Sequence, residues 1–259
     1  MDTKVSMIEI AGIKTELVEC GAGRPLLFLH PGIGIDAKAP VIEAMADSAR
    51  VLAPSHPGFG RSEQPKAMTT IDDLAYFYLD AIEALGLKDA IVVGVSFGAW
   101  IAAEIAVKSC ERIGHLVLAD AFGIKVGDRE TRDIADIFAM TEPQFNERAY
   151  FDPAFAARDY KSLPEADLVI VARNREAMAR YGWSPYMHDP KLKGRLHRIR
   201  AKTLVLWGAA DRIAAPDYGR AWSVAIPGAR FALIERAGHF PHLEAPGDFA
   251  RHVLEFAAA

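Results

Sequence analysis

Short apolar runs alternate with amphipathic stretches along most of the chain. Val5–Ile10 and Ile13–Val18 flank Ala11-Gly12, which predicts an antiparallel hairpin at the start of the domain. The later apolar runs are rich in β-branched residues, which is typical of strands buried on both faces. These strands are expected at Leu26–Leu29, Arg50–Ala53, Ile91–Val93, His115–Ala119, Lys202–Trp207 and Arg230–Ile234.

Stretches of helical periodicity separate these strands. Thr70 offers an N-cap with Asp73 three residues later, which favours a helix through Leu85. Other helices are expected from Asp36 to Ala49 and at Ala99–Lys108, Pro216–Ala225 and Pro246–Phe256. Because strands that alternate with helices pair in parallel, we predict an α/β fold. Its core would be a mostly parallel, eight-stranded twisted sheet with helices on both faces.

This alternation stops at Ala121. No buried strand is evident in residues 121–200, where prolines separate several short helical patterns. These patterns lie at Asp128–Met140, Glu142–Phe151, Pro164–Tyr181 and Pro190–Ile199. We therefore predict an all-helical cap at 121–200, inserted after the sixth strand of an α/β core formed by 1–120 and 201–259. Such an insert typically lies over the carboxyl edge of the sheet, where ligands bind.

Composition narrows the functional classes. The chain has 259 residues, a net charge of -4 and 51% hydrophobic residues, which is typical of a globular protein and gives no sign of nucleic-acid binding. The N-terminus has no apolar leader, and no apolar run approaches membrane-spanning length. Cys20 and Cys110 fit no disulfide or metal pattern. We expect a cytoplasmic protein with a small-molecule substrate and no membrane partner; a homo-oligomer is left open.

The stretch around Ser96 carries the first chemical signal. Gly94, Ser96 and Gly98 form the pattern G-x-S-x-G between a buried strand and a helix. The two glycines suit a turn too tight for a β-carbon, and such a turn presents Ser96 Oγ at the sheet edge. The alternative is a glycine-rich turn in which the serine has no chemical role.

A serine nucleophile needs a base and a carboxylate that orients the base. Asp211 and His239 follow the last two strands, so both are expected at the same sheet edge as Ser96. The order serine, acid, histidine is the one expected of an α/β hydrolase. Asp120 also ends a strand and is the alternative acid.

The chain resembles the α/β-hydrolase superfamily over nearly its whole length. The resemblance is carried by Leu29-His30-Pro31-Gly32, Gly94-Val95-Ser96-Phe97-Gly98, Trp207-Gly208-Ala209-Ala210-Asp211 and Gly238-His239-Phe240-Pro241-His242-Leu243-Glu244. It implies a Ser-His-Asp mechanism with no metal and no cofactor. Two backbone N–H groups would bind the oxyanion. These are assigned to Phe97 and Gly32, because Pro31 has no N–H.

The sequence favours hydrolysis of a carboxylic ester, lactone or thioester through an acyl-Ser96 intermediate. Family members that cleave carbon–carbon bonds of dienoic keto acids usually have Asn before the nucleophile, where this chain has Val95. That reaction is the first alternative; a cofactor-free perhydrolase or haloperoxidase-like activity and a non-enzymatic ligand receptor are the others. We expect a small to medium, largely apolar substrate. Its pocket is predicted to include Ile33, Trp183, His188 and Phe240.

Overall fold

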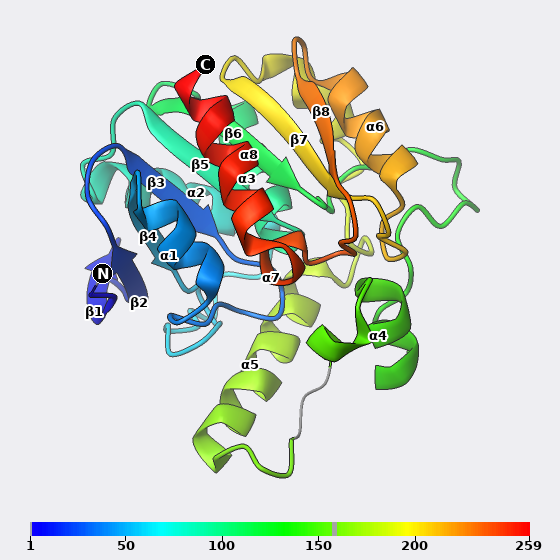
Figure 1. The fold of residues 1–259 in the computed structure, drawn as a ribbon, viewed down its shortest axis with the longest axis horizontal. Helices are drawn as coiled ribbons and strands as arrows, with labels where there is room; N and C mark the ends of the chain where they lie inside the picture. The colour runs from blue at the N-terminus through cyan, green and yellow to red at the C-terminus, as the bar shows by residue number, and fades with distance from the viewer. Residues whose placement is uncertain (1, 157–159) are drawn as a thin grey trace.

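The computed structural model describes residues 2–156 and 160–259 and shows a single eight-stranded sheet (Figure 1). The spatial order is β1-β2-β4-β3-β5-β6-β7-β8, with β2 antiparallel to both β1 and β4 and all other pairs parallel. The predicted fold class is therefore confirmed. The strands are β1 (Lys4–Ile10), β2 (Ile13–Cys20), β3 (Pro25–Leu29), β4 (Arg50–Pro54), β5 (Ala90–Val95), β6 (Ile113–Ala119), β7 (Lys202–Gly208) and β8 (Arg230–Ile234).

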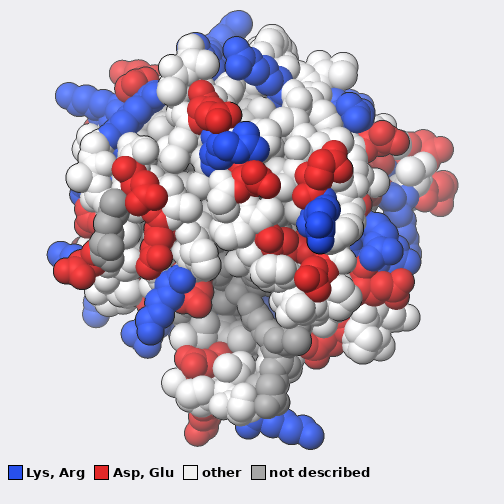
Figure 2. Space-filling model, viewed as in Figure 1, with Lys and Arg blue, Asp and Glu red and all other residues white. Residues whose placement is uncertain are grey.

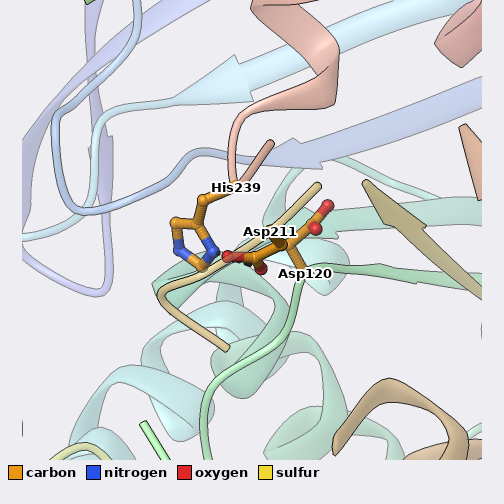
Figure 3. Close-up of side chains that lie close together, drawn as sticks. All are labelled: Asp120, Asp211 and His239. Atoms are coloured by element: carbon orange, nitrogen blue, oxygen red, sulfur yellow. Dashed lines mark hydrogen bonds and ion pairs between the residues drawn. The ribbon is translucent and has the colours of Figure 1, made fainter. Parts of the chain in front are cut away.

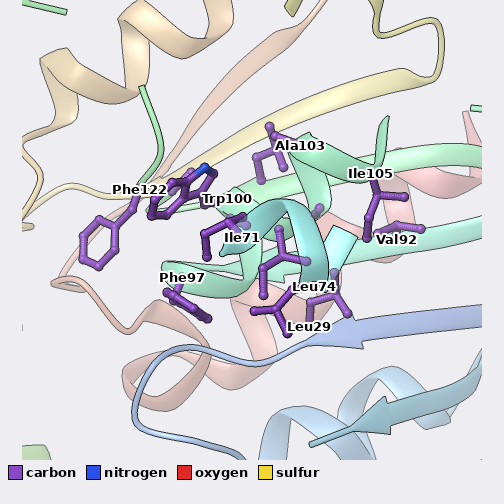
Figure 4. Close-up of a cluster of buried hydrophobic side chains, with 14 of the residues drawn as sticks. Leu29, Ile71, Leu74, Val92, Phe97, Trp100, Ala103, Ile105 and Phe122 are labelled. Atoms are coloured by element: carbon purple, nitrogen blue, oxygen red, sulfur yellow. The ribbon is translucent and has the colours of Figure 1, made fainter. Parts of the chain in front are cut away.

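Helices cover both faces of the sheet, and each face has its own apolar core. One face is packed by α2 (Ile71–Ala84), α3 (Phe97–Lys108) and α6 (Pro216–Ala225). Figure 4 shows part of this core, which includes Leu74 of α2, Trp100 of α3 and Val92 of β5. The other face is packed by α1 (Pro40–Ala46) and α8 (Pro246–Ala258), which lie side by side. The short helix α7 (Pro241–Glu244) precedes α8.

Local chemistry explains where two of these helices begin. Thr70 Oγ1 accepts from Asp73 N at 3.1 Å and Asp73 Oδ2 accepts from Thr70 N at 2.8 Å, so the predicted N-cap of α2 is confirmed. The helix expected from Asp36 instead begins at Pro40. Asp36 Oδ1 accepts from Lys38 N at 2.9 Å and so closes a turn before the helix.

Residues 121–200, between β6 and β7, are only partly helical. They contain α4 (Glu142–Ala149), α5 (Glu165–Gly182) and the 3-10 helices η1 (Pro153–Ala156) and η2 (Lys193–Arg198). The helix predicted at Asp128–Met140 is wrong: this segment forms turns and bends. Asp128 Oδ1 accepts from Thr131 N at 2.8 Å, and Asp133 accepts from Gly127 N at 2.9 Å. Side chains that bond nearby backbone amides in this way compete with helix formation.

In Figure 1, α4 and α5 lie beyond the carboxyl ends of the parallel strands, and α5 extends away from the sheet. The boundaries of a separate cap at 121–200 stay a prediction. On the face drawn in Figure 2, Lys and Arg side chains are interspersed with Asp and Glu. Among the described residues, none of the helices has the length and apolar character needed to span a membrane.

Candidate active site

Ser96 lies in a strained turn between β5 and α3. Its φ of 55° and ψ of -114° are unfavourable for a residue with a β-carbon, and strain of this kind is concentrated at functional sites. A β-carbon on Gly94 would lie 2.5 Å from Ala99 Cα, and one on Gly98 would lie 2.1 Å from Leu29 O. Both glycines are therefore required, because the atoms they approach belong to the backbone.

The structure brings three of the predicted site residues into one hydrogen-bonded chain. Ser96 Oγ lies 2.8 Å from His239 Nε2, and His239 Nδ1 lies 2.8 Å from Asp211 Oδ2. The other oxygen of Asp211 accepts from Ile213 N at 2.8 Å and Ala214 N at 3.1 Å. With Asp211 fixed in this way, His239 Nδ1–H donates to it and Nε2 is left to accept the Ser96 proton. The arrangement can activate a serine hydroxyl by general-base catalysis.

Asp120 lies next to this chain rather than in it (Figure 3). Its Oδ1 accepts from Gly208 N at 2.9 Å, while Oδ2 has no hydrogen-bond partner among the described residues. Complete burial, followed by the neighbouring Asp211 carboxylate, raises the pKa of Asp120 well above its ordinary value. Asp120, Asp211 and His239 have potential metal-ligand atoms within 4.8 Å of one another. Both nitrogens of His239 are already engaged, so this geometry fits proton transfer better than metal binding.

The insert packs directly around His239. The Phe122 ring stacks on the imidazole with a centroid distance of 5.0 Å and an interplanar angle of 20°. His239 N donates to Ala149 O at 2.7 Å, at the C-terminus of α4. Glu244 accepts from Gly238 N at 2.6 Å and from Phe151 N at 2.8 Å, which joins the His239 loop to the segment after α4.

The two predicted oxyanion donors lie on neighbouring elements. Phe97 is the first residue of α3, where backbone N–H groups have no intrahelical partner. Gly98 brings this helix start against the backbone of Leu29 and His30, which precede Pro31 and Gly32 in the same loop. Among the described residues, neither Phe97 N nor Gly32 N donates to a protein backbone group. Their assignment to the oxyanion stays a prediction.

His30 supports this loop as a neutral side chain. His30 Nε2 accepts from His56 N at 3.0 Å, so its Nδ1–H donates to Pro31 O at 2.7 Å. The two imidazoles stack with a centroid distance of 3.7 Å. Burial lowers the pKa of His30 to about 4 and that of His56 well below its ordinary value. An uncharged pair can occupy this fully buried position without a counterion.

A cavity of about 340 Å³ lies between the loop of Gly32 and the insert. Its described lining is mainly apolar, and its polar groups include Asn174 and Arg175 of α5 and Glu142 and Asn146 of α4. Of the predicted pocket residues, Ile33 lines this cavity, whereas Trp183, His188 and Phe240 are absent from its described lining.

The sequence did not indicate where those three side chains would point. Trp183 is 61% exposed, and its ring lies tilted against that of Phe138 with a centroid distance of 5.6 Å. His188 lines a separate cavity and bonds Tyr186 O at 2.8 Å. Phe240 is buried beside Tyr150, with ring centroids 5.4 Å apart.

Asn174 belongs to the surroundings of the candidate site, and the sequence did not indicate it. It lies on α5, is 5% exposed, and bonds the backbone of Ile33 beside Gly32. A polar residue on the apolar side of an amphipathic helix was the available signal, but the sequence does not show what such a residue faces. The contacts of Phe122 and Glu244 with the His239 loop were missed for the same reason.

The fold, the turn at Ser96 and the Ser96–His239–Asp211 chain define a class of proteins. The alpha/beta hydrolase family model matches residues 26–252, so this chain belongs to that family, as its motifs predicted. Within it, the chain is 28% identical to the 2-hydroxymuconate semialdehyde hydrolase of Pseudomonas sp. (strain CF600), over 96% of this chain and 92% of that protein.

Two further relatives are similar over nearly their full lengths. The 2-hydroxy-6-oxo-2,4-heptadienoate hydrolase of Pseudomonas putida F1 is 28% identical, over 98% of this chain and 96% of that protein. A crystal structure of a meta-cleavage product hydrolase from Pseudomonas fluorescens IP01 superimposes with a TM-score of 0.74 at 22% identity, covering 97% and 96% of the two chains. The structural likeness supports the shared fold.

Proposed function

We propose that this hydrolase cleaves a carbon–carbon bond in a dienoic keto acid, with Ser96 as nucleophile, His239 as general base and acid, and Asp211 as the orienting carboxylate. The hydrogen-bonded chain from Ser96 Oγ to Asp211 Oδ2 is the observation that carries the mechanism. The substrate class is supported by the two relatives, whose names describe hydrolases of such compounds. This places the carbon–carbon reaction ahead of the ester hydrolysis that the motifs alone favoured.

In this mechanism Ser96 Oγ attacks the ketone carbon while its proton passes to His239 Nε2. The amides of Phe97 and Gly32 stabilise the resulting oxyanion. Cleavage requires the substrate in its keto tautomer, in which the carbon next to the ketone has gained a proton and is tetrahedral. When the tetrahedral adduct collapses, the carbon–carbon bond breaks and its electron pair enters the conjugated keto acid, which is then protonated by a route that starts at His239. Water, deprotonated by His239, then hydrolyses the acyl-Ser96 ester.

Hydrolysis of a carboxylic ester, lactone or thioester remains the second candidate, because one residue favours it. Val95, immediately before Ser96, is fully buried in the core that packs under α1 and α8. An apolar side chain at this position gives a keto acid no hydrogen bond. An ester needs none there, since its alkoxide leaving group takes the proton directly from His239.

A substrate comparison separates the two candidates. We would measure kcat/KM for 2-hydroxy-6-oxo-2,4-heptadienoate and for p-nitrophenyl esters of two to eight acyl carbons on the same preparation. The carbon–carbon proposal predicts a value for the keto acid at least 10-fold above that of every ester. The reverse order would assign the protein to ester hydrolysis. Ser96→Ala should abolish both activities, and retained turnover would remove Ser96 from the mechanism.

A further inference from the structure

Asn174 occupies a position that is costly for its residue type. It lies in the middle of α5 and is only 5% exposed, whereas most residues around it on the helix are half-buried or exposed. Asparagine is a weak helix former, and a buried amide is unfavourable unless its hydrogen bonds are made. Its presence there therefore depends on what it bonds.

Both ends of the Asn174 side-chain amide form hydrogen bonds with loops at the edge of the sheet. Nδ2 donates to Ile33 O at 3.0 Å, and Oδ1 accepts from Gly60 N at 2.8 Å. The partners determine the orientation of the amide, since Gly60 N can only donate and Ile33 O can only accept. One side chain thus links α5 to two separate loops.

The Ile33 carbonyl belongs to the turn that carries the proposed oxyanion donor. Gly34 N donates to Pro31 O at 2.9 Å and closes this turn around Gly32 and Ile33. Gly34 has a φ of +90°, and a β-carbon on it would lie 2.3 Å from Asn174 Nδ2. The turn and the amide are therefore packed against each other with no room for a side chain between them.

We propose that Asn174 is a positioning residue for the oxyanion hole: its hydrogen bond to Ile33 O holds the Pro31–Gly34 turn so that Gly32 N–H faces the reacting carbonyl oxygen. The inference rests on the proposed function, because it assumes that Gly32 N–H serves the Ser96 reaction. An oxyanion donor is effective when it is oriented before charge develops, so a freely rotating turn would lose transition-state stabilisation rather than substrate binding.

Two variants and one matched control test this role. Asn174→Ala removes both bonds, while the isosteric Asn174→Asp keeps an acceptor for Gly60 N and replaces only the donor to Ile33 O. Arg173→Ala is the control, because Arg173 is the preceding residue of α5 and bonds Ser62 O at 2.8 Å, away from the Pro31–Gly34 turn. Each is assayed with p-nitrophenyl butyrate and with an alkyl trifluoromethyl ketone, which forms a tetrahedral adduct with an activated serine.

Removal of a whole oxyanion donor costs about 10²–10³ in kcat, so loosening one should cost on the order of 10-fold. We expect this loss of kcat in both Asn174 variants, with KM within about 3-fold and ketone affinity reduced by the same factor as kcat. Arg173→Ala should keep kcat within about 2-fold.

Three results would overturn the inference: unchanged kcat in Asn174→Asp, an effect confined to KM, or an equal loss in Arg173→Ala. The last result would show that the loss of any hydrogen bond between α5 and the sheet-edge loops lowers kcat. Circular-dichroism melting identifies a variant that has merely unfolded, and Asn174→Asp remains informative if Asn174→Ala does so. The proposed function is tested separately, by the reaction of the wild-type protein with a fluorophosphonate. If Ser96 does not react, the proposed function itself is wrong.

Discussion

Replacement of Asp211 by Asn should abolish most activity while leaving the fold intact. Asp211 Oδ1 accepts from Ile213 N at 2.8 Å and Ala214 N at 3.1 Å, so an amide at this position will place its oxygen there. Its NH₂ group will then face His239 Nδ1, which lies 2.8 Å from Oδ2 in the wild type. His239 Nδ1 must then accept, the ring proton moves to Nε2, and Nε2 can no longer accept the Ser96 proton.

The wrong tautomer of a triad histidine costs about 10⁴ in kcat, as measured for the equivalent substitution in a serine protease. This corresponds to about 5.4 kcal/mol of lost transition-state stabilisation, at about 1.36 kcal/mol for each factor of ten. The measurement is kcat on a short ester or the keto acid, together with a thermal unfolding curve for each variant.

Asp120→Asn is the matched control. Burial, followed by the neighbouring Asp211 carboxylate, raises the pKa of Asp120 well above its ordinary value. This favours the neutral carboxyl, for which an amide is a close substitute. We expect a loss below about 10-fold, since the Asn oxygen can still accept from Gly208 N. If Asp120→Asn lost about 10³ or more and Asp211→Asn less than 10-fold, the acid would be Asp120 and this account of the site would be wrong.

Three further predictions follow from the site and its surroundings. A fluorophosphonate should label the protein once, and Ser96→Ala should abolish labelling and lower kcat by about 10⁴ or more; labelling that persists in the variant would contradict the role of Ser96. Gly98→Ala should lower kcat by about 10²-fold, because its β-carbon would lie 2.1 Å from Leu29 O and displace the turn; wild-type kcat would refute this. Burial lowers the pKa of His242 to about 3, so stability present above about pH 6.5 falls as the pH drops toward 3. Urea titrations at pH 7 and 4 give the free energy of unfolding at each pH. Its decrease between pH 7 and 4 should be about 3 kcal/mol smaller in His242→Phe than in the wild type, and an equal decrease in the two proteins would exclude this contribution of His242.

The sequence determined the features that depend on neighbouring residues. The apolar run before Ser96 predicted part of β5 (Ala90–Val95), and the glycines around Ser96 predicted the turn that follows it. The alternation of strands with helices predicted the parallel sheet and hence the edge shared by Ser96, Asp211 and His239. Such signals are strong because strand burial and tight turns constrain residue types at fixed spacing.

Helical periodicity failed where nearby side-chain hydrogen bonds competed with the helix, and residue type failed to show where a side chain points. The helix predicted from the periodicity of Asp128–Met140 does not form, because Asp128 and Asp133 make side-chain hydrogen bonds to nearby backbone amides. The substrate pocket was predicted from residue type, and Trp183 and His188 point elsewhere because their directions depend on how the insert packs.

Only the tertiary structure decided which polar groups meet. It placed Asp211 in hydrogen-bonding contact with His239 and Asp120 beside them, a choice that the sequence left open. It also brought Asn174 to Ile33, 141 residues earlier in the chain. Periodicity reports which face of an element is buried, but the partner on that face is set by the crossing of elements far apart in sequence, and no local signal encodes it.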